Sequence, residues 1–237
     1  IYNRLKNNFS EIPGMPLHIW YSSILKDKSG IIWAGTYGNG VNFYNSKTKK
    51  SGNFIYNAKN KNSLSSDRVN NLFEDSNNNL WFATEGGLCR FYPKTNTFKR
   101  YTTANGLPAN FILSIAEDDN KILWVSSSKG LVAFNSTTEK ATVYTKANGI
   151  LNDQFNFSSA FKDSKGNMYF GSVKGLISFH PDNFTASSFS PAIFITGFQV
   201  NNKELGINKD ASPLNKSVSL TDKIILTHTQ STFSIDF

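Results

Sequence analysis

The stretch that decides the fold is DSNNNLWFAT at residues 75–84, a polar turn followed by an aromatic residue and small residues. The same phrase recurs at 27–36, 118–127 and 163–172. Its aromatic residues stand at positions 33, 81, 124 and 169, so successive copies lie 48, 43 and 45 residues apart. A repeat of this length, built from short strands and tight turns, is typical of β-propeller blades.

Each repeat divides into short apolar runs separated by polar turns. The second repeat predicts strands over 69–74, 80–84, 87–92 and 97–101, and the third predicts strands over 111–117, 122–126, 130–134 and 141–144. Such near-even spacing is what a four-stranded blade requires, and no segment has a convincing helical period. We therefore predict an all-β fold with about four four-stranded antiparallel propeller blades in residues 1–184.

Composition and charge narrow the class of protein. The chain has 237 residues and a formal net charge of +8, but its lysines are scattered and form no arginine-rich stripe, which argues against a nucleic-acid face. No apolar run is long enough to span a bilayer, and nothing resembles a signal peptide. Since the chain begins at Ile1 rather than methionine, we expect it to be a piece of a longer protein.

The blade phrase stops after residues 179–181, and composition changes. Apolar runs at 191–200, 217–220, 223–226 and 232–237 predict further strands, with a turn at 201–204. We assign residues 185–237 to the start of a second β domain, which has too few strands for a complete sandwich.

These residues carry a family likeness. The phrase Asp-x-x-Gly-x-[Leu/Ile]-Trp, followed by Gly-Leu and then by Phe-Tyr-Pro at 91–93 or Phe-His-Pro at 179–181, resembles the two-component regulator propeller repeat. The segments 198–204, 225–228 and 233–237 resemble the immunoglobulin-like "triple tyrosine" module that follows such propellers. The chain departs from the family in holding about four blades, an incomplete Ig-like module and no kinase or receiver motif.

The resemblance implies the periplasmic sensor region of an inner-membrane hybrid sensor histidine kinase of Bacteroidetes. In such receptors the propellers sense an oligosaccharide and control genes for polysaccharide use. The Ig-like module relays the signal across the membrane as a homodimer. We expect the piece itself to be non-catalytic and to need no cofactor.

No catalytic or metal-binding pattern stands out. His18, His180 and His228 lack metal-ligand spacing, and Cys89 lies in an apolar strand, as a buried structural thiol would. Residues 75–79 partly match a calcium loop but lack its distal glutamate, so a hairpin turn is favoured. The repeated aromatic residues are predicted to pack between adjacent blades rather than to stack on sugars.

Topology predicts where a ligand would bind. Loops that enter the first strand of each blade share a face with loops that join the second strand to the third. An oligosaccharide would meet aromatic rings, amides and basic groups there, and Arg68, Lys129 and Lys174 would favour an acidic glycan. The candidate ligand-binding residues are Trp20, Tyr37, Asn39, Arg68, Asn110, Lys129, Gln154 and Lys174.

Three alternatives remain open at this stage. These loops could be solvated and unused, with the ligand on other blades. The propeller could be a scaffold that binds another protein. It could also be a lyase or glycosidase, which is disfavoured because no paired carboxylates or histidines recur at the mouth.

Overall fold

The computed structural model of this chain describes residues 2–184, 194–209 and 212–237. The chain folds as two compact units, residues 1–184 and 185–237. Each unit is described by itself below.

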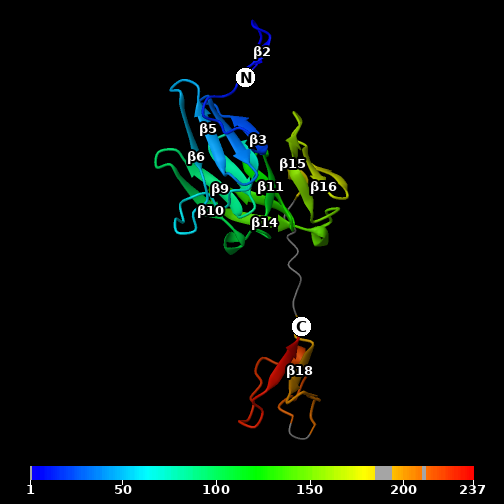
Figure 1. The fold of residues 1–237 in the computed structure, drawn as a ribbon. Helices are drawn as coiled ribbons and strands as arrows, with labels where there is room; N and C mark the ends of the chain where they lie inside the picture. The colour runs from blue at the N-terminus through cyan, green and yellow to red at the C-terminus, as the bar shows by residue number, and fades with distance from the viewer. Residues whose placement is uncertain (1, 185–193, 210–211) are drawn as a thin grey trace. The chain divides into compact units, whose positions relative to one another are not determined.

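The first unit is a β-propeller arc of four antiparallel sheets, which follow one another along the chain from blue to yellow in Figure 1. A two-stranded hairpin, β1 (Tyr2–Asn3) and β2 (Asn8–Phe9), precedes them. We call the four sheets blades 1 to 4. Blade 1 contains β3 (Tyr21–Lys26), β4 (Ile31–Thr36), β5 (Val41–Asn45) and β6 (Lys50–Phe54), and blade 2 contains β7 (Val69–Glu74), β8 (Leu80–Thr84), β9 (Gly87–Tyr92) and β10 (Thr97–Tyr101). Blade 3 contains β11 (Ile112–Glu117), β12 (Ile122–Ser127), β13 (Gly130–Asn135) and β14 (Lys140–Tyr144), and blade 4 contains β15 (Phe155–Lys162), β16 (Met168–Ser172) and β17 (Gly175–Phe179).

The strands predicted in the second and third repeats are confirmed, those of the second to the residue. Blade 4 differs from the prediction, because its sheet holds three strands among the described residues. After β17 the chain enters a 3₁₀ helix at Pro181–Asn183. Proline lacks the N–H that a fourth ladder strand would use, so the chain leaves the sheet here. The other 3₁₀ helices of this unit lie at Thr103–Asn105 and Lys146–Asn148.

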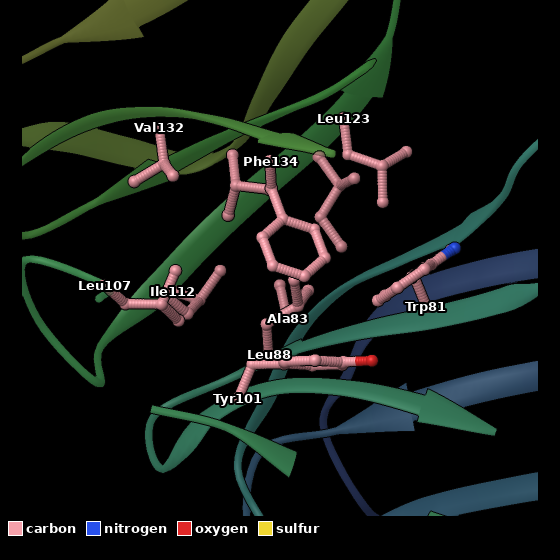
Figure 2. Close-up of a cluster of buried hydrophobic side chains, with 11 residues drawn as sticks. Trp81, Ala83, Leu88, Tyr101, Leu107, Ile112, Leu123, Val132 and Phe134 are labelled. Atoms are coloured by element: carbon pink, nitrogen blue, oxygen red, sulfur yellow. The ribbon is translucent and has the colours of Figure 1, made fainter. Parts of the chain in front are cut away.

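The core lies between neighbouring blades rather than inside them. Figure 2 shows the cluster between blades 2 and 3, where the Phe134 ring points toward Leu88 and Tyr101. The Trp81 ring lies 5.9 Å from Phe134, and Trp33 lies 5.2 Å from Phe91 of the following blade. The prediction that the repeated aromatic residues pack between blades is therefore confirmed for the three tryptophans, since Trp124 likewise contacts Phe179 of blade 4. Tyr169 of blade 4 is only partly buried, and its ring contacts Phe161 of the same blade.

An aspartate in each polar turn holds the tryptophan of its blade. Nε1 of Trp33, Trp81 and Trp124 donates at 2.8 Å to the carboxylates of Asp27, Asp75 and Asp118. The Asp75 carboxylate also accepts from the backbone N–H of the turn, which closes a tight hairpin. The hairpin interpretation of residues 75–79 is confirmed, since the carboxylate is occupied by the turn itself.

Polar contacts on the same side of the sheets join consecutive blades. The Glu117 carboxylate of blade 3 accepts from the N–H of Ser76 at 2.7 Å and from its hydroxyl at 3.0 Å. The carboxylate of Glu74 accepts equivalently from the N–H of Lys28 at 3.0 Å. Between blades 3 and 4 an ion pair of Asp119 and Lys162 takes this place. Each interface thus combines an apolar core with a polar tie.

A second tie between blades 2 and 3 makes stability depend on pH. Lys99 Nζ donates to Glu139 at 2.6 Å, and the Tyr101 hydroxyl donates to the same carboxylate at 2.9 Å. The hydrogen bond from Lys99 is the main cause that lowers the pKa of Glu139. The pKa of Tyr101 is raised, mainly by burial and next by its hydrogen bond to Glu139.

We expect Glu139→Gln to reduce the loss of stability in acid. Because the folded-state pKa of Glu139 lies below its unfolded value of about 4.3, its contribution is present above that pH and is lost as pH falls through the folded pKa. The pair is partly exposed, so the contribution is under about 1 kcal/mol. Urea unfolding at pH 7 and pH 3.5 measures it; an equal pH dependence in wild type and variant would contradict the role.

The second unit contains one small sheet in the order β19–β18–β20. Its strands are β18 (Gly197–Val200), β19 (Lys203–Glu204) and β20 (Phe233–Asp236). The strand predicted over 217–220 is wrong, because Val218–Leu220 is a 3₁₀ helix closed by the Thr221 hydroxyl on the Ser217 carbonyl at 2.8 Å.

The strand predicted over 223–226 is also wrong, since no strand forms there and Ile225 stays exposed without a packing partner to favour one. Of the strand predicted over 191–200, residues 197–200 form β18, residues 194–196 are irregular, and 191–193 lie outside the described residues. The Ig-like assignment stays a prediction.

Candidate ligand-binding mouth

The two predicted sets of loops meet in every blade. The N–H of Tyr37 donates to the Trp20 carbonyl at 3.0 Å, and the N–H of Glu85 donates to the Arg68 carbonyl at 3.1 Å. Blades 3 and 4 repeat the contact: the N–H of Ser128 donates to the Phe111 carbonyl at 3.1 Å, and the N–H of Val173 donates to the Gln154 carbonyl at 3.2 Å. We call this face the mouth.

The mouth contains a pocket of about 320 Å³ between blades 1, 2 and 4. Trp20 and Tyr37, both predicted, contribute aromatic faces from blade 1. Phe157 of β15 adds a third ring, and 81% of Trp20 and 53% of Phe157 are exposed. The remaining lining residues are Ser22, Asn70 and Ser158.

A bulge in β15 places Phe157 and Ser158 at this pocket. The register between β15 and β16 shifts between Phe155 and Ala160, and Ser158 has a positive φ of 47°. Bulges of this kind re-aim side chains next to functional sites. The Ser158 hydroxyl donates to the Asn70 carbonyl at 2.7 Å, which joins blade 4 to blade 2 across the pocket.

Asn70 lines the pocket and holds a buried acceptor without a partner. Its side chain is 2% exposed, and its Nδ2 donates to the Ile112 carbonyl at 2.6 Å. Its Oδ1 has no hydrogen-bond partner, which is costly for a buried polar atom unless a ligand or water supplies a donor. Asn70 is not among the predicted site residues, although two asparagines in the strand run 69–74 were the available hint, because asparagine is depleted in strands.

Arg68 lies beside the pocket and is already paired. Its guanidinium stacks over the Tyr37 ring at 4.8 Å and contacts the Glu85 carboxylate at 3.5 Å. Glu85 Oε1 is buried and has no hydrogen-bond partner. The positive charge of Arg68 is therefore balanced locally by the Glu85 carboxylate.

The other predicted residues are exposed at the mouth but do not line this pocket. Asn110 uses its Oδ1 to accept from the N–H of Thr103 at 2.8 Å, which serves the loop. The N–H groups of Lys129 and Lys174 donate to Ser127 and Ser172 hydroxyls. The backbone carbonyl of Asn39 accepts from Asn53 Nδ2 at 2.8 Å, and that of Gln154 accepts from the N–H of Val173.

The described residues contain little other reactive chemistry. Cys89 is fully buried in β9, where burial raises the pKa of its thiol, so the structural interpretation is confirmed. Among the described residues no three His, Cys, Asp or Glu side chains gather as metal ligands. A search of the same residues for a helix long and apolar enough to cross a membrane finds none.

Comparison with known proteins agrees with this architecture. The family described as "Two component regulator propeller" matches residues 14–38, 63–86 and 106–129, each containing a mouth loop and a tryptophan hairpin. Three segments of this chain, one in each of blades 1 to 3, therefore match the two-component regulator propeller model. The chain is similar to the extracellular domain of BT3049, a putative hybrid two-component system of B. thetaiotaomicron, with 26% identity, a TM-score of 0.73 and 96% of this chain covered.

A curated relative is "Histidine kinase P4" of Formosa agariphila, 28% identical over 90% of this chain. This chain spans 19% of that relative and 30% of the BT3049 chain. Virginiamycin B lyase from Staphylococcus aureus shares the fold alone, at 16% identity and a TM-score of 0.51, with 68% of this chain and 56% of the lyase covered.

Proposed function

We propose that this chain is part of the periplasmic sensor region of a hybrid two-component histidine kinase, and that its mouth pocket binds an oligosaccharide without catalysis. The observation that carries the proposal is the gathering of three exposed aromatic rings, those of Trp20, Tyr37 and Phe157, around one pocket at the mouth. The similarity to an extracellular two-component domain and to a histidine kinase supports the sensor role and the periplasmic, membrane-anchored location.

The chemistry of the pocket suits a sugar. Aromatic faces pack against the C–H faces of pyranose rings, and the hydroxyl groups of a sugar can donate to the hydroxyl oxygens of Ser22 and Ser158, which line the pocket. A lyase or glycosidase would instead need an acid and a base or a paired carboxylate. In the described part of the pocket lining no carboxylate pair is present.

Within the proposal, the charged groups at the mouth contribute a preference for acidic glycans, whereas the pocket lining supplies most of the affinity for the sugar. Glu85 balances Arg68, whereas Lys129 and Lys174 form no ion pair among the described residues. Both lysines are exposed, so their attraction for an acidic glycan is screened by salt. We therefore propose that acidic substituents strengthen binding at low ionic strength.

We expect Trp20→Ala and Asn70→Ala each to weaken oligosaccharide binding at least about tenfold, since the first removes a stacking face and the second removes an amide that lines the pocket. Calorimetry of the chain against a panel of neutral and acidic oligosaccharides measures this. Lys61→Ala, an exposed residue outside the pocket, is the control. Asn70→Ala also loses the bond to Ile112, so its unfolding midpoint is measured in parallel.

No binding across the panel, or equal binding by Trp20→Ala, would exclude the mouth as the sugar site. A protein partner whose binding is lost in Trp20→Ala, without any sugar binding, would favour the scaffold function. Within the proposal, residues 185–237 relay the signal and the intact receptor acts as a homodimer.

A further inference from the structure

A second pocket, of about 530 Å³, lies between blades 1 and 2 on the side of the aspartate hairpins. Its walls are the rings of Trp33, Phe43, Phe54 and Phe91, and the apolar part of its surface predominates. Successive ring centroids lie 5.5 Å (Trp33 to Phe43), 5.5 Å (Phe43 to Phe54) and 5.1 Å (Phe54 to Phe91) apart. We call it the interblade pocket.

The pocket exists because blade 1 differs from blade 2 at one cross-strand pair. Phe43 pairs with Gly52 across β5 and β6, and the same register in blade 2 pairs Arg90 with Lys99. A Cβ at Gly52 would lie 2.6 Å from the Phe43 ring, so glycine is needed for the ring to lie there.

In blade 2 long polar side chains occupy the corresponding space. Arg90 donates to Asn79 Oδ1 at 2.7 Å and lies 5.7 Å above the Trp81 ring, while Lys99 reaches Glu139 of the next blade. Blade 1 has neither group. Its interface with blade 2 is therefore open and aromatic where the next interface is filled and polar.

The lining of the pocket carries one cation, Lys28, and two carboxylates, Asp27 and Glu74. Lys28 Nζ donates to Asn78 Oδ1 at 2.6 Å, and the Glu74 carboxylate accepts from the N–H of Lys28. Asn96 contributes an amide from the turn between β9 and β10. Two carboxylates against one cation disfavour an anionic ligand, the Asp27 carboxylate already accepts from Trp33 Nε1, and the amides can bond a hydroxyl group.

We propose that the interblade pocket binds a small neutral aromatic molecule with a hydroxyl group at the rim. Phe43 and Phe54 are the half-buried rings of this wall and can make edge-to-face contact with another ring, and the volume lies in the range of small-molecule sites. This site is independent of the proposed sugar site, which lies at the mouth.

The test is calorimetry and ligand-observed NMR of the chain with three probes: 2-naphthol, its saturated analogue decahydro-2-naphthol, and naphthalene-2-sulfonate. We expect saturable binding of 2-naphthol with a Kd below about 1 mM. The double variant Phe43→Arg/Gly52→Lys, which transplants the blade 2 pair, should weaken it at least about tenfold. Trp20→Ala at the mouth should leave it unchanged.

The unfolding midpoint of the double variant is measured alongside, and Lys28→Ala, which keeps all four rings, provides a milder second variant that should retain 2-naphthol binding. Absence of saturable 2-naphthol binding overturns the proposal, as does wild-type affinity in a folded double variant. Equal affinity for the saturated analogue contradicts the aromatic class, and tighter binding of the sulfonate contradicts the neutral class.

Discussion

Asp75→Ala is expected to destabilise the first unit by about 3–5 kcal/mol. Asp75 is 1% exposed, and its carboxylate accepts from Nε1 of Trp81 at 2.8 Å and from the N–H groups of Asn77 and Asn79 at 3.0 and 2.8 Å. Removing it leaves a buried indole N–H and turn donors without partners, each of which costs about 1–3 kcal/mol. Urea unfolding followed by tryptophan fluorescence and circular dichroism measures the change.

Two further variants make the result specific to the carboxylate. Asn77→Ala alters an exposed side chain of the same turn and should change stability by less than about 0.5 kcal/mol. Asp75→Asn keeps the shape but turns one acceptor into a donor, so it should lose most of the same stability. A loss below about 1 kcal/mol for Asp75→Ala would show that the hairpin does not depend on this contact.

The same aspartate explains how far sequence alone predicted the fold. The phrase at 75–84 holds the turn, its capping carboxylate and the tryptophan that it fixes, so local chemistry determines the strands on either side. That is why the strands of the second repeat were predicted to the residue. In residues 217–226 the apolar runs have no such turn and Ile225 has no packing partner, so β-propensity alone misled.

The site was less accessible to sequence reasoning. Topology placed Trp20 and Tyr37 on one face correctly, because strand direction follows from the repeat. The acceptor of Asn70 depends on Ile112 taking its amide, and Phe157 reaches the pocket through a bulge. The pairing of Arg68 with Glu85 is likewise a tertiary contact. None of these follows from spacing in the chain.

Leu88→Ala is expected to cost about 3 kcal/mol, whereas Leu176→Ala at the same position of blade 4 should change stability by less than about 0.5 kcal/mol. Leu88 pairs with Ala83 and Leu176 with Gly171, at equivalent registers in their blades. Leu88 is 0% exposed between blades 2 and 3, but Leu176 is 65% exposed, because no described blade covers that face of blade 4. A buried leucine loses its transfer energy and leaves a cavity, and an exposed one does neither.

This matched pair separates the two sources of blade stability. If strand propensity within each sheet dominated, the two substitutions would cost about the same, since both remove a leucine from the third strand of a blade. If packing between blades dominates, the loss of stability follows the burial of the substituted side chain. Ile24 of blade 1 is 68% exposed and its counterpart Leu72 of blade 2 is 6% exposed, so Ile24→Ala should likewise cost less stability than Leu72→Ala. Equal losses at Leu88 and Leu176 in urea unfolding would therefore reject the interblade core as the main source of stability in this arc.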